Sequence, residues 1–503
     1  MKRYTSRLAA GLILIGVAAG CAEEVADPSP TPPPAGTAAP GVSTPEPGTA
    51  APTPTTADSS APGSDAPAPT TPASDAPGVT DPATSSPTSA PGGVDEDTQW
   101  ALDYTGGTAG EASGDPYRIG YINAEDLFPE NTIGINAAVA FANAELGGVG
   151  GRPIEIVPCV APPGDDGSSC ATQMVNDADI DLVLTGTFQD AHQALYDVLG
   201  GNKAVLIGNG LTLEDFTNTA GVSFVAGSPA VVPSLGYTAA NLLPEKPATA
   251  AVLHESSPAA TAAAELLLQP VLRAAGIEVT TVPINTTASA AEVQSAMIAA
   301  GADTADVFLP IVAVNQCINV YDSIQALGID PTVVTTALCY GTPMTDHLAE
   351  IGVGGDVPDG WYFSGYGYSY FRPDRESGML TYVNKIQEYG VPAPGATTLE
   401  YTGFAGPSFG NVLTAIKLIN QIGVDNVDST NLDAALRGFT GPMFIQAGPI
   451  ACGQVKIVGL EIFNAMCASQ AGIQQYSGGE WLSVADGLDP DPGPVNVLEI
   501  AVG

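Results

Sequence analysis

The sequence predicts an α/β protein with mainly parallel sheets, from two observations. Short β-rich runs alternate with amphipathic helical runs along the chain, and this alternation restarts after the proline-containing segment Leu242–Pro247. Such alternation is typical of parallel strands joined by right-handed helical crossovers, with helices on both faces of the sheet. The restart predicts a second α/β unit of similar size.

The first strand–helix–strand unit begins with a strand at Arg118–Ile122 and a helix at Ile133–Leu146. The glycine-rich Gly147–Gly151 ends that helix, because glycine accepts the left-handed backbone of a helix C-terminus. Arg152–Val157 is then the next strand. Ligands of parallel sheets bind beyond the carboxyl ends of strands, so the loop Asn123–Asn131 is the first candidate for a site.

The remaining elements follow from the same periodicities. Strands are expected at 181–184, 204–207, 248–253, 278–283, 306–310 and 332–336, and helices at 171–177, 191–199, 259–275, 290–300, 315–327, 379–389, 406–422 and 431–437. A strand-like stretch lies near 455–463, and the tail carries Asp486, Asp489 and Asp491 without EF-hand spacing, which predicts a solvated segment.

The N-terminus has the pattern of an export signal. Lys2, Arg3 and Arg7 precede the apolar run Leu8–Ala19, which is short for a membrane span. Small residues stand directly before Cys21, as in a bacterial lipobox. Residues 1–20 are therefore expected to be a lipoprotein signal peptide, and Cys21 the lipidation site. An ordinary signal peptide is the alternative. The protein is therefore expected outside the cytoplasm, anchored to the cell membrane by lipid.

Residues 21–99 are rich in Pro, Thr, Ala and Ser, and we expect a disordered tether there, because the segment offers little apolar surface to bury. Residues 100–503 are expected to form the globular domain. Acidic residues number 54 against 14 Lys and Arg, for a net charge of −40. Nucleic acid is an improbable partner for such a chain, because phosphate binding needs a basic surface.

The chain has seven cysteines, and six remain if Cys21 is acylated. They fall into three close pairs, and export favours disulfides. Spacing alone does not select one pairing. Sequential pairing is preferred because each pair brackets one local unit: Cys159–Cys170, Cys317–Cys339 and Cys452–Cys467. No Cys-x-x-Cys is present, so no metal site or other cofactor is predicted.

One motif raises the possibility of an enzyme. Gly406–Gly410 matches the G-x-S-x-G nucleophile elbow of α/β-hydrolases around Ser408. That fold needs a histidine after the serine, whereas His192, His254 and His347 all precede it. Ser408 is therefore interpreted as a residue at the start of a helix, and the protein as a non-enzyme.

The globular part resembles the type I periplasmic binding proteins, specifically the leucine/isoleucine/valine-binding group of ABC-transporter substrate-binding lipoproteins. The resemblance rests on GINAAVAFANAELGGVGGRPIEIVPC, DLVLTG, AVLIGNGLTLEDFT, the segment AAVLHESSPAATAAAELLLQPVLRAAGIEV and GPMFIQAGP, in this order. It implies two Rossmann-like lobes joined by a three-stranded hinge. The N-lobe would comprise about 115–245 and 367–446, and the C-lobe about 247–365 and 447–500.

The resemblance also implies a ligand between the lobes. In the family, N-lobe hydroxyls and backbone N–H groups hold the carboxylate of the ligand. The matching positions here are Thr187, Gln189, Asn209, Gly210, Leu211 and Thr212.

The C-lobe departs from the pattern of amino-acid binders, which place aromatic residues and an acid after its strands. The corresponding segments hold Ser256–Pro258, Val312–Gln316 and Leu338–Tyr340, so Glu255, Ser257, Asn315 and Tyr340 are the candidate ligand contacts. Glu255 or Asp126 would replace the missing acid. Tyr340, Tyr366 and Tyr368 would supply an aromatic wall.

The sequence thus predicts a lipid-anchored protein that captures a small molecule (an amino acid, an amide or a related small carboxylate or aromatic) and delivers it to the membrane subunits of an ABC permease. A ligand-sensing lipoprotein of the same fold is the alternative, and an exported hydrolase is a weaker one.

Overall fold

The structure is a computed structural model, and it describes residues 94–190, 192–366, 370–373, 378–446, 448–453, 463–486 and 493–500. The predicted signal peptide, the Cys21 lipidation site, most of the tether, Tyr368 and most of the strand-like stretch near 455–463 lie outside these residues. Within the described part, no helix has the length and apolar character needed to cross a membrane.

The first sheet has five parallel strands in the order β2-β1-β3-β4-β5. Its strands are β1 (Tyr117–Asn123), β2 (Ile154–Val160), β3 (Ile180–Thr185), β4 (Ala204–Ile207) and β5 (Val222–Ser223). Its helices are α1 (Glu96–Thr105), α2 (Pro129–Glu145), α3 (Ser168–Asn176), α4 (Gln193–Leu199), α5 (Leu213–Thr217), α12 (Met379–Tyr389), α13 (Ala405–Ile422) and α14 (Ser429–Gly438).

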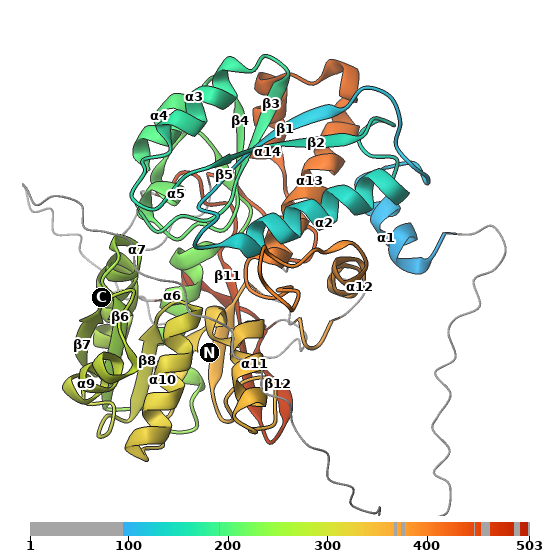
Figure 1. Cartoon of the computed structure of the whole chain (residues 1–503). Coiled ribbons are helices and arrows are strands. Elements are labelled where there is room, and N and C mark those ends of the chain that lie inside the picture. The colour runs from blue at the N-terminus through green and yellow to red at the C-terminus, as the bar shows by residue number, and fades with distance from the viewer. Residues whose placement is uncertain are drawn as a thin grey trace, which may run out of the picture. The chain divides into compact units, whose positions relative to one another are not determined.

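Both faces of this sheet are covered by helices (Figure 1). Leu182 and Leu184 belong to one apolar cluster with residues of α2 and α13, whereas Val183 between them belongs to a second cluster with residues of α3 and α4. Successive side chains of a strand point to opposite faces, so a strand that is buried on both faces reads as a continuous apolar run. This is why the sequence predicted β3 and β4 closely.

The second sheet region starts with three parallel strands in the order β7-β6-β8. A parallel bridge from Phe308 to Val333 connects β8 to β9, which continues through β10, β11 and β12. The strands are β6 (Thr249–Glu255), β7 (Glu278–Ile284), β8 (Val307–Ile311), β9 (Val334–Thr336), β10 (Tyr362–Gly365), β11 (Gln470–Ser477), β12 (Glu480–Ala485) and β13 (Val495–Asn496).

The helices of the second region are α6 (Gly227–Tyr237), α7 (Pro258–Ala262), α8 (Gln269–Ala274), α9 (Ala290–Ala300), α10 (Val314–Leu327) and α11 (Thr342–Glu350). The helix predicted over 259–275 is a continuous helical run in which π-helix Ala263–Leu268 separates α7 from α8. The sequence missed α6, whose two prolines and two glycines weaken the helical signal. Burial of nine of its residues compensates for that weak propensity.

Two predictions from the sequence were wrong. The tether was expected to extend to residue 99, but α1 begins at Glu96, where the Asp95 side chain accepts a hydrogen bond from Thr98 N. Trp100 holds this helix on the domain through an edge-to-face contact with Phe444. In the tail, Asp486 is buried rather than solvated, and its carboxylate accepts a hydrogen bond from Gln474 Nε2 at 2.9 Å. Asp489 and Asp491 lie outside the described residues.

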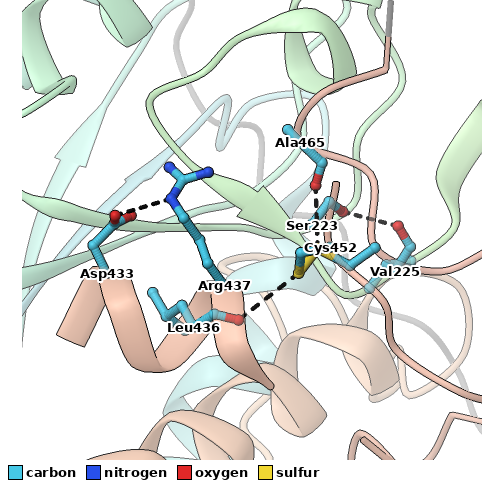
Figure 2. The surroundings of a disulfide bond; sticks show 8 residues. Ser223, Val225, Asp433, Leu436, Arg437, Cys452 and Ala465 are labelled. Atoms are coloured by element: carbon cyan, nitrogen blue, oxygen red, sulfur yellow. Dashed lines mark hydrogen bonds and ion pairs between the residues drawn. A yellow bond between two sulfur atoms is a disulfide. The ribbon is translucent and has the colours of Figure 1, made fainter. Parts of the chain in front are cut away.

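The three predicted disulfides are confirmed: Cys159–Cys170, Cys317–Cys339 and Cys452–Cys467. Figure 2 shows the surroundings of Cys452, whose sulfur lies 3.8 Å from the carbonyl oxygen of Leu436 on α14.

The Cys467 end of the third disulfide extends the first sheet. Ser223, at the end of β5, and Ala465 lie next to each other (Figure 2). Ser223 N donates to Ala465 O and Cys467 N donates to Ser223 O, so residues 465–467 pair with the end of β5. This pairing places them at the first sheet, although they follow the predicted C-lobe boundary at 447. The next strand, β11, belongs to the second sheet region, so the chain crosses between the regions after residue 467.

Candidate functional site

A cavity, which we name the main cavity, lies where the carboxyl ends of both sheets meet. From the first sheet it is lined by Phe128 after β1, Gln189 after β3 and Leu211 after β4. From the second it is lined by residues that end or follow β6, β8, β9 and β10: Glu255, Ser257, Val312, Ala313, Thr336, Ala337, Leu338, Tyr340, Gly365 and Tyr366. Its volume, counted as space for the centre of a water-sized sphere, is about 80 Å³.

The walls of the main cavity are largely apolar. Val231 and Val232 of α6, Ile311 of β8 and Phe404 are among the apolar side chains that line it. Apolar walls with a few placed polar groups are typical of small-molecule sites. Among its described lining residues no Lys or Arg is present.

Glu255 is the one acidic residue among the described residues of the lining. It ends β6, is 3 % exposed, and its Oε1 accepts a hydrogen bond from Ala313 N at 2.9 Å. Ala313 is the N-cap of α10, so this carboxylate faces the positive end of a helix. Burial raises the pKa of Glu255, and the Ala313 hydrogen bond opposes that rise. The carboxylate therefore favours a ligand group that donates hydrogen bonds or carries positive charge.

Most of the other polar side chains that line the main cavity carry hydroxyl groups. The Thr336 hydroxyl at the end of β9 is buried and has no hydrogen-bond partner within the part of the chain that the structure describes. Ser257 caps α7, with its side chain accepting from Ala260 N. Ser228 lies in the first turn of α6. An unpartnered buried hydroxyl in the cavity wall indicates a place for a polar atom of a ligand or for a water molecule.

Five of the ten predicted ligand contacts line the main cavity. Gln189, Leu211, Glu255, Ser257 and Tyr340 do so, as does Tyr366 of the suggested aromatic wall. Three of the five come from the C-lobe, where the sequence departs most from the amino-acid binders.

The other five do not line it. Thr187 and Asn209 are fully buried beneath it, both hydrogen-bonded to Asn131. The Thr212 hydroxyl caps α5 by accepting a hydrogen bond from Asp215 N, while the Asp215 side chain accepts one from Thr212 N. The hydroxyl is therefore engaged in capping the helix.

The remaining predicted positions also lie away from the lining. Gly210 meets the ring of Phe216, which an added Cβ would approach to 2.4 Å, so this glycine is explained by packing. Asn315 is exposed in the first turn of α10, and Asp126 is exposed in the loop after β1. Of the two acids suggested to replace the missing one, only Glu255 lines the main cavity.

Phe128 belongs to the loop Asn123–Asn131, which the sequence predicted as the first candidate for a site, whereas Ser228, Thr336 and Phe404 of the lining were missed. Thr336 could have been found, because it ends a strand that the sequence did predict. Ser228 and Phe404 come from segments without a clear periodic signal, and only tertiary packing brings them here.

The hydrolase motif does not form a nucleophile elbow. Gly406–Gly410 lies inside α13, and Ser408 is buried with its hydroxyl donating to Asn131 Oδ1 at 2.8 Å. His254 Nδ1 lies 2.8 Å from the carbonyl oxygen of Glu255, as a strand-end histidine can. Within the residues described, no group of His, Cys, Asp and Glu side chains is arranged to hold a metal ion.

Comparison with known proteins agrees with this architecture. A family model described as periplasmic binding protein matches residues 123–454. No curated protein matches the chain.

Solved structures share the fold at low sequence identity. A solute-binding protein of an ABC transporter from Rhodopseudomonas palustris BisB5, in complex with 3,4-dihydroxybenzoic acid, is 13 % identical with a TM-score of 0.58, over 77 % of this chain and 99 % of that one. The branched-chain amino acid transporter substrate-binding protein LivJ from Streptococcus pneumoniae, in complex with isoleucine, is 12 % identical with a TM-score of 0.56, over 76 % and 100 %. An ABC transporter substrate-binding protein from Sphaerobacter thermophilus is 15 % identical with a TM-score of 0.58, over 77 % and 100 %.

Proposed function

Because this chain belongs to the periplasmic binding protein family, type I and of the leucine/isoleucine/valine-binding kind, we propose that it captures a small solute in the main cavity and performs no chemistry on it. The observation that carries the proposal is the main cavity itself. Strand ends of both sheets contribute to one largely apolar space with a single acidic side chain. A ligand held between two lobes can be buried more fully than on one surface, and lobe closure would mark the bound state.

The lining favours a solute with an apolar body and one group that donates hydrogen bonds to Glu255. An ammonium or an amide N–H group would meet this requirement. A carboxylate would meet no basic side chain among the described lining residues, and the N–H groups of Leu211 and Thr212 already donate to Asp215 Oδ2. Amides, amines and amino acids are therefore the first classes to test, followed by aromatic acids such as the ligand of the R. palustris protein.

A thermal-shift screen of these classes, followed by calorimetry, tests the binding proposal. A solute present at a hundredfold its Kd stabilises the native state by about 2.7 kcal/mol, so a true ligand raises the melting temperature. We expect Glu255→Gln to weaken an amine ligand about tenfold and the control Glu265→Gln, at an exposed position, to leave its affinity unchanged. If no solute raises the melting temperature, the proposal is wrong.

We further propose that Cys21 is lipidated and that the bound solute is delivered to an ABC permease. The support is the lipobox-like N-terminus and the family. Labelled palmitate should enter the wild-type protein and not Cys21→Ala. Cells lacking the gene should lose uptake of the identified solute and regain it with the wild-type gene. Normal uptake without the gene would instead favour the sensing alternative.

A further inference from the structure

A second, smaller cavity, which we name the inner cavity, adjoins the main one. Tyr340 and Tyr366 line both cavities. Behind them the inner cavity is lined by Tyr370, Ile445 and Gln446, with three further apolar side chains. Its volume on the same measure is about 10 Å³, close to the roughly 10–15 Å³ that one water molecule requires.

Gln446 is the unusual residue of the inner cavity. Its side chain is 4 % exposed, and neither its Nε2 nor its Oε1 has a hydrogen-bond partner among the described residues. Among the described residues with a buried polar atom left unpaired, it is the only one with two such atoms. By comparison, Nε2 of buried Gln316 donates to the carbonyl oxygens of Thr286 and Ala288. Leaving both ends of a buried amide unpaired is costly, so the amide requires an explanation.

The backbone beside Gln446 is also unusual. Ile445 has φ 63°, and among the described residues it is the only non-glycine residue with a positive φ. A β-branched residue adopts this conformation only when the surrounding structure imposes it, and such outliers cluster at ligand sites. Ile445 and Gln446 line the same cavity, so the strained backbone and the unpaired amide occur together.

The chemistry of the inner cavity selects a neutral partner. Its described lining contains no acidic or basic side chain. A carboxylate or ammonium group entering it would lose its hydration without gaining an ion pair. A carboxamide would instead donate one hydrogen bond from its N–H to Gln446 Oε1 and accept one at its oxygen from Gln446 Nε2. The small volume excludes a whole solute, and a terminal carboxamide enters it only if side chains of the lining move apart.

We propose that the inner cavity is a subsite that receives the terminal carboxamide of a solute whose apolar body lies in the main cavity. Tyr340 and Tyr366 form the boundary that this group passes, and Gln446 determines specificity for amides over acids. This inference rests on the proposed binding function and names the class of its solute.

Calorimetry with three matched probes tests the subsite. Hexanamide, hexanoate and 2-heptanone share a flexible apolar chain and differ in the terminal group. We expect hexanamide to bind at least tenfold more tightly than either other probe. Gln446→Leu should abolish that preference and leave the affinity for 2-heptanone within twofold, while the control Gln193→Leu, at an exposed position of α4, should change neither.

The stability of the ligand-free protein gives a second readout. Because Gln446→Leu removes two unpaired buried atoms, its melting temperature should rise by about 1–3 °C. A fall would show that Gln446 has a structural partner and would overturn the proposal. If the leucine variant does not fold, Gln446→Met provides the same calorimetric test with an unbranched side chain.

The failures of the two proposals are distinguishable. If the probes bind but hexanamide has no advantage, or keeps it in the Gln446 variants, then the inner cavity holds only water and the subsite is wrong while solute binding stands. If neither these probes nor any solute of the broader screen binds, both proposals fail together.

Discussion

Asn131 is the residue through which the loops beneath the main cavity are held together, and Asn131→Leu is the most informative stability variant. The residue lies in the first turn of α2 and is fully buried. Its Nδ2 donates to Thr187 Oγ1 at 3.0 Å, and its Oδ1 accepts from Asn209 Nδ2 and from Ser408 Oγ, both at 2.8 Å. It thereby connects α2 to α13 and to the loops that follow β3 and β4.

The loss of stability in Asn131→Leu follows from the buried groups that lose a hydrogen-bond partner. Asn209 Nδ2 keeps hydrogen bonds to Phe404 O and to Ser408 Oγ, both at 3.3 Å, but the hydroxyls of Thr187 and Ser408 each lose their hydrogen bond to the Asn131 amide. Each stranded buried group costs about 1–3 kcal/mol, so the variant should lose about 2–5 kcal/mol. For a domain of about 400 residues the unfolding entropy is roughly 0.8 kcal/mol per kelvin, which gives a fall in melting temperature of about 3–6 °C.

Differential scanning calorimetry of the wild type and variant measures this shift. Asn202→Leu is the matched control, because Asn202 is exposed and its substitution should stay within about 0.5 kcal/mol. Ser408→Ala removes one member of the network and should cost about 1 kcal/mol. A melting temperature of Asn131→Leu within about 1 °C of the wild type would refute the reasoning, because the stranded hydroxyls would then cost almost nothing.

Three further perturbations have defined outcomes. Replacing both Cys317 and Cys339 by alanine should cost about 3 kcal/mol in calorimetry, because the bond closes a loop with a sequence separation of 22; an unchanged melting temperature would contradict this. Burial and neighbouring carboxylates raise the pKa of Glu130 from 4.5 to about 8, so the folded state keeps a proton that the unfolded state releases. Stability therefore falls as pH rises from about 4.5 to 8. The melting temperature of Glu130→Gln should exceed that of the wild type at pH 8 and equal it at pH 4. Equal melting temperatures at both pH values would refute the raised pKa. Lys385→Met should lower the free energy of unfolding by about 3–5 kcal/mol, because the side chain is 4 % exposed and pairs with Asp95 at the N-cap of α1 and Glu145 of α2. Glu388→Gln, at a side chain that is 55 % exposed, should change the melting temperature little in the same scan.

The disulfides and the central strands were predictable because their signals are local. Cys317 and Cys339 bracket a single helix–strand unit, so sequential pairing was also the pairing that the fold brings together. The run at β4 was predicted to the residue, since a strand buried on both faces is continuously apolar. The helix α6 was missed because its prolines and glycines have low helix propensity, and burial overrides that propensity only in the folded chain.

Half of the predicted contact residues line the main cavity, because the ends of parallel strands can be located from local sequence signals. Residues that end or follow strands, such as Glu255 and Leu211, line the main cavity because the carboxyl ends of parallel strands meet there. Thr187 and Thr212 occupy the same kind of position and still lie off the lining, since one hydroxyl is bound by Asn131 and the other caps a helix. Sequence alone cannot say which of several equivalent hydroxyls is already hydrogen-bonded.

The sequence by itself indicated the α/β class, the family and a preferred disulfide pairing, because periodicity, motif order and the local units that the cysteine pairs bracket are all carried within short segments. Only the tertiary structure decided which polar groups remain unpaired. Thr336 and Gln446 are ordinary residues in the sequence, and they become notable because distant segments surround them without satisfying their hydrogen bonds. Hydrogen-bond satisfaction depends on all neighbours at once, so it is a property of the packed chain.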